Sequence, residues 1–381
     1  MNAQRIATII RLELTQRIRS VAWYVLLGIF GVLLLGVTAL TFISVPRDAF
    51  QQAGSTAYSI IVFFVLLLVV LVSPTLSGNA INGDRDAATL APVQVTLATT
   101  TDIIVGKFLS AWITGLAFLV VSAPFLIFAA VFGEVRADVL LVSLVVLIVE
   151  VAVVAGLGVA LSGILARPLF SVAVTYLTVA ALVVGTPIAF GLVGTAFPTE
   201  IESRQRYLQP VWNEPMQVPE ECMTAEPGAT TPSPECVDLG FGPGVEEPEY
   251  ECGPWMTSTY TSPRFDRVWW LLAANPFVIL ADATPTVWRD GYPIDAFGAL
   301  KVGVRTAQIA PDPVQEYDEC DNATGVPGGD YPTSEEQVAG TVPSWFVGLG
   351  VQLALLALLM WRAAVRTHTP SRRLPPGTRI A

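Results

Sequence analysis

The sequence VLLVSLVVLIVEVAVVAGLGVALSGIL extends from Val139 to Leu165 and contains a single ionisable side chain, Glu150. A helix needs about 20 mostly apolar residues to cross the hydrocarbon core of a bilayer, and this stretch is longer than that. A helix also pairs its backbone polar groups within the segment, as lipid requires. We therefore expect a membrane-spanning helix here and a membrane protein as a whole.

Further apolar segments meet the same requirement, and the composition agrees with them. Only 14% of the residues are charged and 53% are hydrophobic, whereas about a quarter of a soluble domain is charged. The first segment is too long for a signal peptide, and no small-residue cleavage pattern follows it. The predicted fold class is an all-α polytopic membrane protein with six spans. The other spans are Val21–Val45, Ala57–Val72 (extendable through Ser73–Leu76), Phe108–Phe132, Leu169–Phe197 and Trp345–Trp361.

Arginines flank both ends of the chain, before the first span and in the tail at 362–381. Positive charge is retained on the cytoplasmic side of membrane proteins. Both termini are therefore predicted to be cytoplasmic, in a plasma or inner membrane, and the number of spans to be even. The apolar segment Val268–Ala283, which Pro276 interrupts, is then not a seventh span. We expect a re-entrant or interfacial helix pair there.

The segment 198–342 is rich in Pro, Gly, Glu and Thr and holds most of the 32 acidic residues. Such a composition buries little apolar surface, so a loop-rich extracytoplasmic insert between the fifth and sixth spans is expected. Disulfides persist outside the cytosol, which predicts two disulfides in one of three pairings. A zinc site is the alternative, disfavoured by long spacings and by the distant position of the only histidine, His368. The four cysteines are Cys222, Cys236, Cys252 and Cys320.

Two interpretations of this insert remain open. It is either a compact lid over the outer mouth of the protein or a solvated spacer without a substrate role. Its acidity and cysteines fit both.

The loop at 77–107 is the most informative polar stretch. It contains the charged triplet Asp84-Arg85-Asp86 and a partly helical run that Pro92 limits. Thr99–Asp102 is a plausible N-cap region for the helix that leads into the third span. We expect a short helix on the bilayer surface that exposes charged side chains to a cytosolic partner; an ordinary solvated loop is the alternative.

This loop resembles the signature region of type-2 ABC exporter permeases. In that family an acidic-basic stretch with Thr-Leu precedes a short helix, a polar turn and a Gly-Lys pair. The sequence departs from the family pattern by Asp in place of the commoner Glu, and by Ala88 where Gly often precedes Thr. The matching positions are Asp84, Arg85, Asp86, Thr89, Leu90, Gly106 and Lys107.

The resemblance implies a permease subunit that forms a dimer, with an identical or a related copy, above two ABC ATPase subunits. It further implies an amphipathic cytoplasmic helix within 1–20 and re-entrant helices at 268–283. ATP and Mg²⁺ would be held by the ATPase, and membrane lipids surround the helices. The residues expected to couple to the ATPase are Asp84, Arg85, Asp86, Thr89, Leu90 and Lys107.

Several functions are disfavoured by the residues themselves. No GxxxxGK[ST] phosphate loop occurs, so this chain is not expected to be an enzyme or to hold a cofactor by itself. Nothing indicates a metal site or a nucleic-acid surface. The predicted organisation is a cytoplasmic helix at 1–20, spans at 21–197 with the coupling loop 77–107, an outer domain at 198–342, a sixth span at 343–361 and a basic tail at 362–381.

Glu150 lies near the middle of the fourth span, where an ionisable group is costly and is a candidate for function. It is interpreted as lining a substrate path, as a protonated structural group, or as a partner of Ser171, Thr175 or Thr178 on the fifth span. The small residues Ala152, Ala155, Gly156 and Gly158 offer a face for close helix contact, and Pro187 is expected to kink the fifth span.

Two further functions compete with export. A mechanical transducer would use the same architecture to move the outer domain without transporting anything. A proton-coupled secondary transporter would use Glu150, although the chain has no detectable internal repeat.

Overall fold

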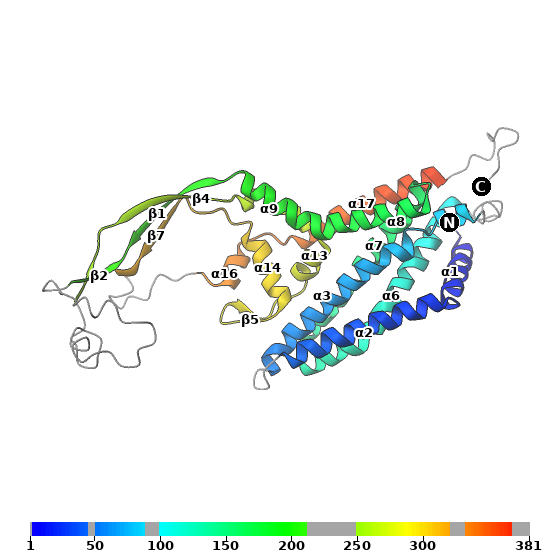
Figure 1. Cartoon of the computed structure of the whole chain (residues 1–381), viewed down its shortest axis with the longest axis horizontal. Helices are drawn as coiled ribbons and strands as arrows, with labels where there is room; N and C mark the ends of the chain where they lie inside the picture. The colour runs from blue at the N-terminus through cyan, green and yellow to red at the C-terminus, as the bar shows by residue number, and fades with distance from the viewer. Residues whose placement is uncertain (1, 45–49, 88–98, 212–248, 321–331, 368–381) are drawn as a thin grey trace, which may run out of the picture. The chain divides into compact units, whose positions relative to one another are not determined.

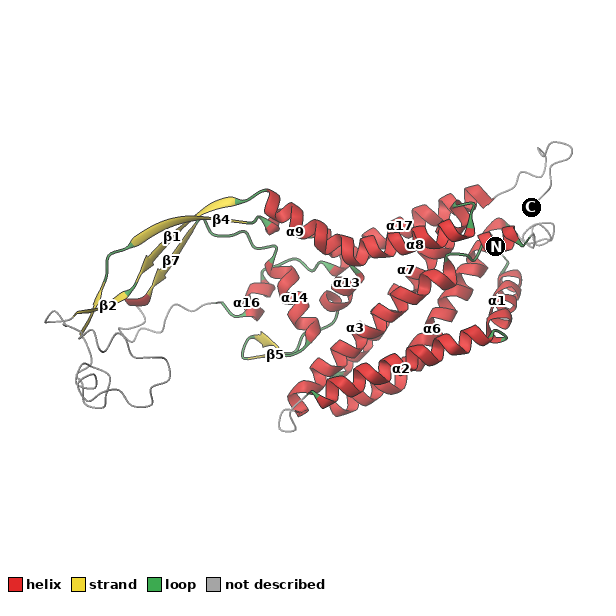
Figure 2. Cartoon of the chain, viewed as in Figure 1, coloured by secondary structure: helices red, strands yellow, loops and turns green. Residues whose placement is uncertain are grey.

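The computed structural model describes residues 2–44, 50–87, 99–211, 249–320 and 332–367. Within these ranges six helices are long and apolar enough to cross a membrane (Figures 1 and 2). The predicted six-span helical architecture is therefore confirmed. The helices are α2 (Val21–Ile43), α3 (Phe50–Ser77), α6 (Thr100–Phe132), α7 (Ala137–Ile164), the composite of α8 (Pro168–Ala180) and α9 (Thr186–Ala196), and α17 (Trp345–Thr367).

Helix α7 is the centre of the bundle and packs against α3, α6, α8 and α17. Its glycines permit this close packing, since a β-carbon at Gly158 would overlap Oγ of Ser77 on α3. A β-carbon at Gly156 would lie 2.6 Å from Cδ1 of Leu356 on α17. The predicted small-residue face of the fourth span is confirmed at these two positions.

The N-terminal helix α1 (Ala3–Ile18) precedes α2 and packs against α6. Asn2 caps it by accepting a hydrogen bond from the backbone N–H of Gln4 at 3.0 Å. Between α3 and α6 lies the short helix α4 (Asn82–Asp86).

The fifth membrane helix is interrupted by a π-helical turn at Ala181–Gly185, between α8 and α9. Pro187 follows directly and has no N–H to donate to the carbonyl oxygen of Val183, its partner in a regular helix. The side chain of Asn275 donates to that oxygen at 2.9 Å and to Oγ1 of Thr186 at 3.0 Å. The expected distortion near Pro187 thus takes the form of a widened turn fixed from outside.

Asn275 belongs to a pair of short helices, α12 (Trp270–Ala273) and α13 (Pro276–Ala283), where a helix pair was predicted. They follow the 3₁₀ turn η3 (Phe265–Arg267) and pack on α17. The chain then forms the two-stranded β5–β6 (Trp288–Arg289 and Tyr292–Pro293), α14 (Ala296–Thr306) and α16 (Ser334–Ala339).

Asp282 at the end of α13 joins α13, α14 and α17. Its Oδ2 accepts hydrogen bonds from the backbone N–H of Ser344 at 2.5 Å and of Trp345 at 2.9 Å, where α17 begins. Its Oδ1 accepts from Nε of Arg305 on α14 at 2.5 Å. A buried carboxylate therefore fixes the first turn of the sixth membrane helix.

The second compact unit comprises Pro198–Pro263 and Pro311–Tyr331. In it β1 (Thr199–Arg206) pairs antiparallel with β4 (Met256–Ser262) and parallel with β7 (Val314–Asp318). Strands β2 (Leu208–Val211) and β3 (Glu249–Cys252) form a separate antiparallel pair.

Cys252 and Cys320 form a disulfide in this unit, with Cα atoms 5.8 Å apart. One of the predicted disulfides is thereby confirmed, while Cys222 and Cys236 lie outside the described residues. The expectation of a loop-rich insert was incomplete, because the sheet was not foreseen. The compact units also divide the predicted 198–342 domain, since Arg264–Ala310 belongs to the helical unit.

Candidate coupling site

The candidate site lies where α1, α4 and the first turns of α6 meet. Helix α6 begins at a capping box in which Oγ1 of Thr99 accepts from the N–H of Asp102, and Asp102 accepts from the N–H of Thr99, both at 3.2 Å. The N-cap predicted for this region is confirmed. Asp102 also accepts from the backbone N–H of Asn2 at 3.1 Å, so the same carboxylate fixes the start of α1.

Lys107 lies two turns further along α6 and is 3% exposed. Its Nζ is 2.5 Å from Oε1 of Glu13 on α1 and 2.6 Å from Oδ2 of Asp84 on α4. A single buried ammonium thus joins three helices. Because desolvating a lysine is costly without a counter-charge, both carboxylates are needed to hold it there.

Gly106 explains how α1 comes so close to α6. A β-carbon at this position would lie 2.8 Å from Cγ2 of Ile9 on α1. The two residues of the Gly-Lys pair therefore act together: Gly106 leaves room for α1 to pack against α6, and Lys107 binds α1 through Glu13.

Arg17 anchors the other end of α1. Its Nη2 donates to the carbonyl oxygen of Leu76 near the end of α3 at 2.8 Å. Burial lowers the pKa of the Arg17 guanidinium, and the carboxylate of Glu13 opposes this shift. Helix α1 is consequently held by α6 through Glu13 and by α3 through Arg17.

Arg85 extends the network to the ends of two membrane helices. Its Nη2 donates to the carbonyl oxygen of Gly163 on α7 at 3.2 Å and to Oγ1 of Thr367 on α17 at 3.3 Å. Its Nη1 reaches the carbonyl oxygen of Leu165 at 3.4 Å. A cation at the C-terminus of a helix is favoured by the helix dipole. The planar guanidinium suits several acceptors at once.

Ser162 of α7 holds the start of α4. Its Oγ accepts hydrogen bonds from the backbone N–H of Ile81 at 2.9 Å and of Asn82 at 3.0 Å. Helix α4 is therefore attached to α7 through both its backbone and the Arg85 side chain.

The structure brings together three of the residues predicted for coupling, namely Asp84, Arg85 and Lys107. The charged groups of Asp84 and Arg85 bind within the chain, although both side chains remain partly exposed. Asp86 is the exposed member of the triplet. Thr89 and Leu90 lie outside the described residues.

Glu150 lies far along α7 from this network and is fully buried. Its carboxylate faces the side chain of Gln352 on α17. Among the described residues it accepts no hydrogen bond of ordinary geometry. The interpretation that pairs Glu150 with the fifth span was wrong. Thr175 and Thr178 donate to their own helix, and the hydroxyl of Ser171 has no hydrogen-bond partner within the described part of the chain.

Sequence reasoning missed Glu13, Ser162 and Gln352. Glu13 offered a signal, since it is an acidic residue on a short helix otherwise rich in arginine. Ser162 and Gln352 are neutral polar residues within apolar runs, and such residues pair with polar groups of neighbouring helices. No protein-family model matches the chain, and no curated protein is significantly similar to it.

Proposed function

We propose that this chain is the membrane subunit of an ATP-driven exporter, and that a separate ATPase subunit supplies the energy. The observation that supports this most is the binding of Lys107 by Glu13 of α1 and Asp84 of α4. A force applied to α1 or α4 would reach α6 through ion pairs and α7 and α17 through Arg85. The network has the connections that a coupling element needs.

The proposal places this network on the cytoplasmic side. The arginines of α1 and of the end of α17 then face the cytoplasm, as positive charge does in membrane proteins. The disulfide-bonded unit, with Cys252 and Cys320, then lies in an oxidising compartment. Two such subunits would enclose the path, each with its own network above an ATPase subunit.

Asp86 is the residue through which the proposal is tested most cleanly. It is exposed at the end of α4, so its replacement does not disturb the buried ion pairs. The chain, tagged and extracted in mild detergent from its own host, should co-purify with an ATPase subunit. The Asp86→Lys variant should lose most of that ATPase.

Asp312→Lys is the matched control, because Asp312 is an exposed carboxylate of the other unit. It should retain the ATPase in full. Absence of any ATPase from the wild-type preparation would contradict the proposal.

A mechanical transducer is the second candidate. The fifth membrane helix ends at Ala196, and strand β1 begins at Thr199. A movement of α9 would therefore pull directly on the sheet, which favours an action on an external partner. Transport assays in vesicles separate the two functions, since only the exporter would move a solute or lipid.

A further inference from the structure

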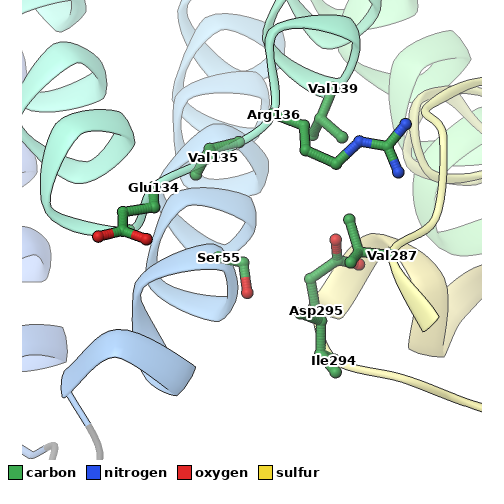
Figure 3. Close-up of a pocket in the computed structure, with 9 residues that line it drawn as sticks. Ser55, Glu134, Val135, Arg136, Val139, Val287, Ile294 and Asp295 are labelled. Atoms are coloured by element: carbon green, nitrogen blue, oxygen red, sulfur yellow. The ribbon is translucent and has the colours of Figure 1, made fainter. Parts of the chain in front are cut away.

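A cavity of about 170 Å³ (Figure 3) lies beside the end of α6. Because the coupling site lies at the beginning of α6, the cavity is at the opposite end of this helix. It is formed by the first turns of α3, the turn between α6 and α7, and the segment before α14. Its apolar walls are Val135, Val139, Val287 and Ile294.

Hydrogen bonds make the cavity a fixed structure. Oγ1 of Thr56 on α3 donates to the carbonyl oxygen of Ile294 at 2.7 Å, and Oγ of Ser59 accepts from the N–H of Ala296 at 3.0 Å. The hydroxyls of Tyr58 and Ser143 join α3 to α7 at 2.8 Å. The lining segments are thus bound to one another independently of any ligand.

Gly54 and Gly133 bring two helices into close contact at the edge of the cavity. A β-carbon at Gly54 would overlap the backbone of Gly133, so α3 and the end of α6 meet without side chains between them. The chain then turns through Glu134, whose φ of 47° lies in the left-handed region. Such a backbone angle is costly for a residue with a side chain, and a tight turn is one place where it is tolerated.

The buried charged side chain of the lining is a carboxylate, that of Asp295. Asp295 is 5% exposed, and its Oδ1 accepts from the N–H of Gly298 at 2.6 Å. Asp295 forms no ion pair within the described part of the chain, but the nearby ammonium of Lys301, which donates to the carbonyl oxygen of Thr284 at 2.6 Å, favours its charged form. Glu134 also lines the cavity, but it is exposed and its carboxylate points away from Ser55 and Asp295 (Figure 3).

Among the described lining residues the cation is Arg136, and its charge is already neutralised. Nη2 of Arg136 lies 2.5 Å from Oδ2 of Asp138, and its Nε donates to Oδ1 at 3.1 Å. Ser55 lines the cavity (Figure 3), and its shielded Oγ has no hydrogen-bond partner among the described residues. Burial also raises the pKa of Asp295, so a bound cation would stabilise its charged form.

We propose that this cavity binds a small organic ammonium group. The ammonium forms an ion pair with the carboxylate of Asp295 and donates a hydrogen bond to Oγ of Ser55. The four apolar walls favour a cation that carries carbon over a bare metal ion, which requires several oxygen ligands. The volume suits a primary amine of a few heavy atoms. The amine is carried either by the headgroup of a membrane lipid, since the cavity lies at the ends of spanning helices, or by a free solute.

Ethanolamine is the probe that tests this site, titrated against the purified full chain in detergent by calorimetry. Ethylene glycol, its neutral analogue, should not bind. Asp295→Asn retains an N-cap for α14 but removes the charge, and should weaken ethanolamine binding about tenfold or more. Asp290→Asn is the matched control, because Asp290 is exposed outside the cavity, and it should bind as the wild type does.

Ser55→Leu fills the cavity without altering any charge and should also abolish binding, which keeps the test decisive if Asp295→Asn does not fold. Native mass spectrometry of protein taken from membranes containing phosphatidylethanolamine identifies the source. If the wild type retains that lipid and the two variants do not, the natural ligand is the lipid headgroup. If the wild type binds free ethanolamine but retains no lipid, the natural ligand is a free solute. Failure of the wild type to bind either, or equal binding by both variants, would overturn the proposal.

Discussion

Lys107 and Glu13 form a buried ion pair across 94 residues of sequence, with Nζ and Oε1 2.5 Å apart. The pair fixes a surface helix, α1, to a membrane helix, α6. Because Asp84 shares the same ammonium, a change in any of the three helices alters the environment of the other two. The Lys107 ammonium, shared by Glu13 and Asp84, is the basis of the coupling that we propose.

Replacing Lys107 with Met should lower the free energy of unfolding by about 2–4 kcal/mol, because two carboxylates lose their partner. Denaturant titration in detergent, followed by Trp fluorescence, measures this. Arg19→Met is the control, since Arg19 is exposed, and should change stability by less than about 0.5 kcal/mol. Adding Glu13→Gln to Lys107→Met should recover part of the lost free energy of unfolding, because one of the unpaired carboxylates is then removed. If the effects of the two single substitutions on stability simply add in the double variant, a direct ion pair is contradicted.

Glu150→Gln should leave the thermal stability unchanged or raised. The substitution keeps the shape of a fully buried side chain and removes the cost of burying a charge beside Gln352. Glu150→Ala should lower stability, since it leaves a cavity. A Glu150→Gln variant that loses transport while its partner still hydrolyses ATP would instead favour the proton-coupled secondary transporter.

Asn275→Ala should destabilise the protein by about 1–3 kcal/mol, because the carbonyl oxygen of Val183 loses its side-chain donor near Pro187. The comparison with Asn275→Ser isolates that bond. Serine retains an N-cap for α13 but is too short to reach the carbonyl oxygen of Val183 in the π-helical turn. It should therefore recover only the part of the stability loss that is due to capping. Full recovery by serine would show that the bond to Val183 contributes nothing.

Stability should rise with pH between about 8 and the ordinary lysine value of 10.5. Burial lowers the pKa of Lys301 to about 8, against the opposing effects of Asp282 and Asp295. In this window the unfolded chain binds more protons than the folded one, so raising the pH favours folding, by on the order of 3 kcal/mol at most. Melting temperatures across the window measure the effect. A Lys301→Met variant with the same pH dependence would exclude Lys301 as its source.

The parts of the fold that were predictable from sequence are those that depend on local signals. Lipid demands long apolar runs, which is why α6 and α7 were foreseen, and the capping box of Thr99 and Asp102 spans only three residues. The ion pairs of Lys107 depend on side chains from three distant segments, and no periodicity encodes them. Strand β1 was missed because its sequence TEIESRQR contains one apolar residue and lacks the alternation typical of strands.

If an ATPase contacts the exposed end of α4, a short cross-linker placed at residue 86 should reach it. Asp86→Cys would be introduced into the tagged full chain, treated in native membranes with a short thiol-to-amine cross-linker and analysed by mass spectrometry, with Asp312→Cys as the matched control. We expect a covalent adduct between residue 86 and an ATPase subunit, and none from residue 312. An ATPase that co-purifies but never cross-links to residue 86, or the absence of any ATPase, would contradict it.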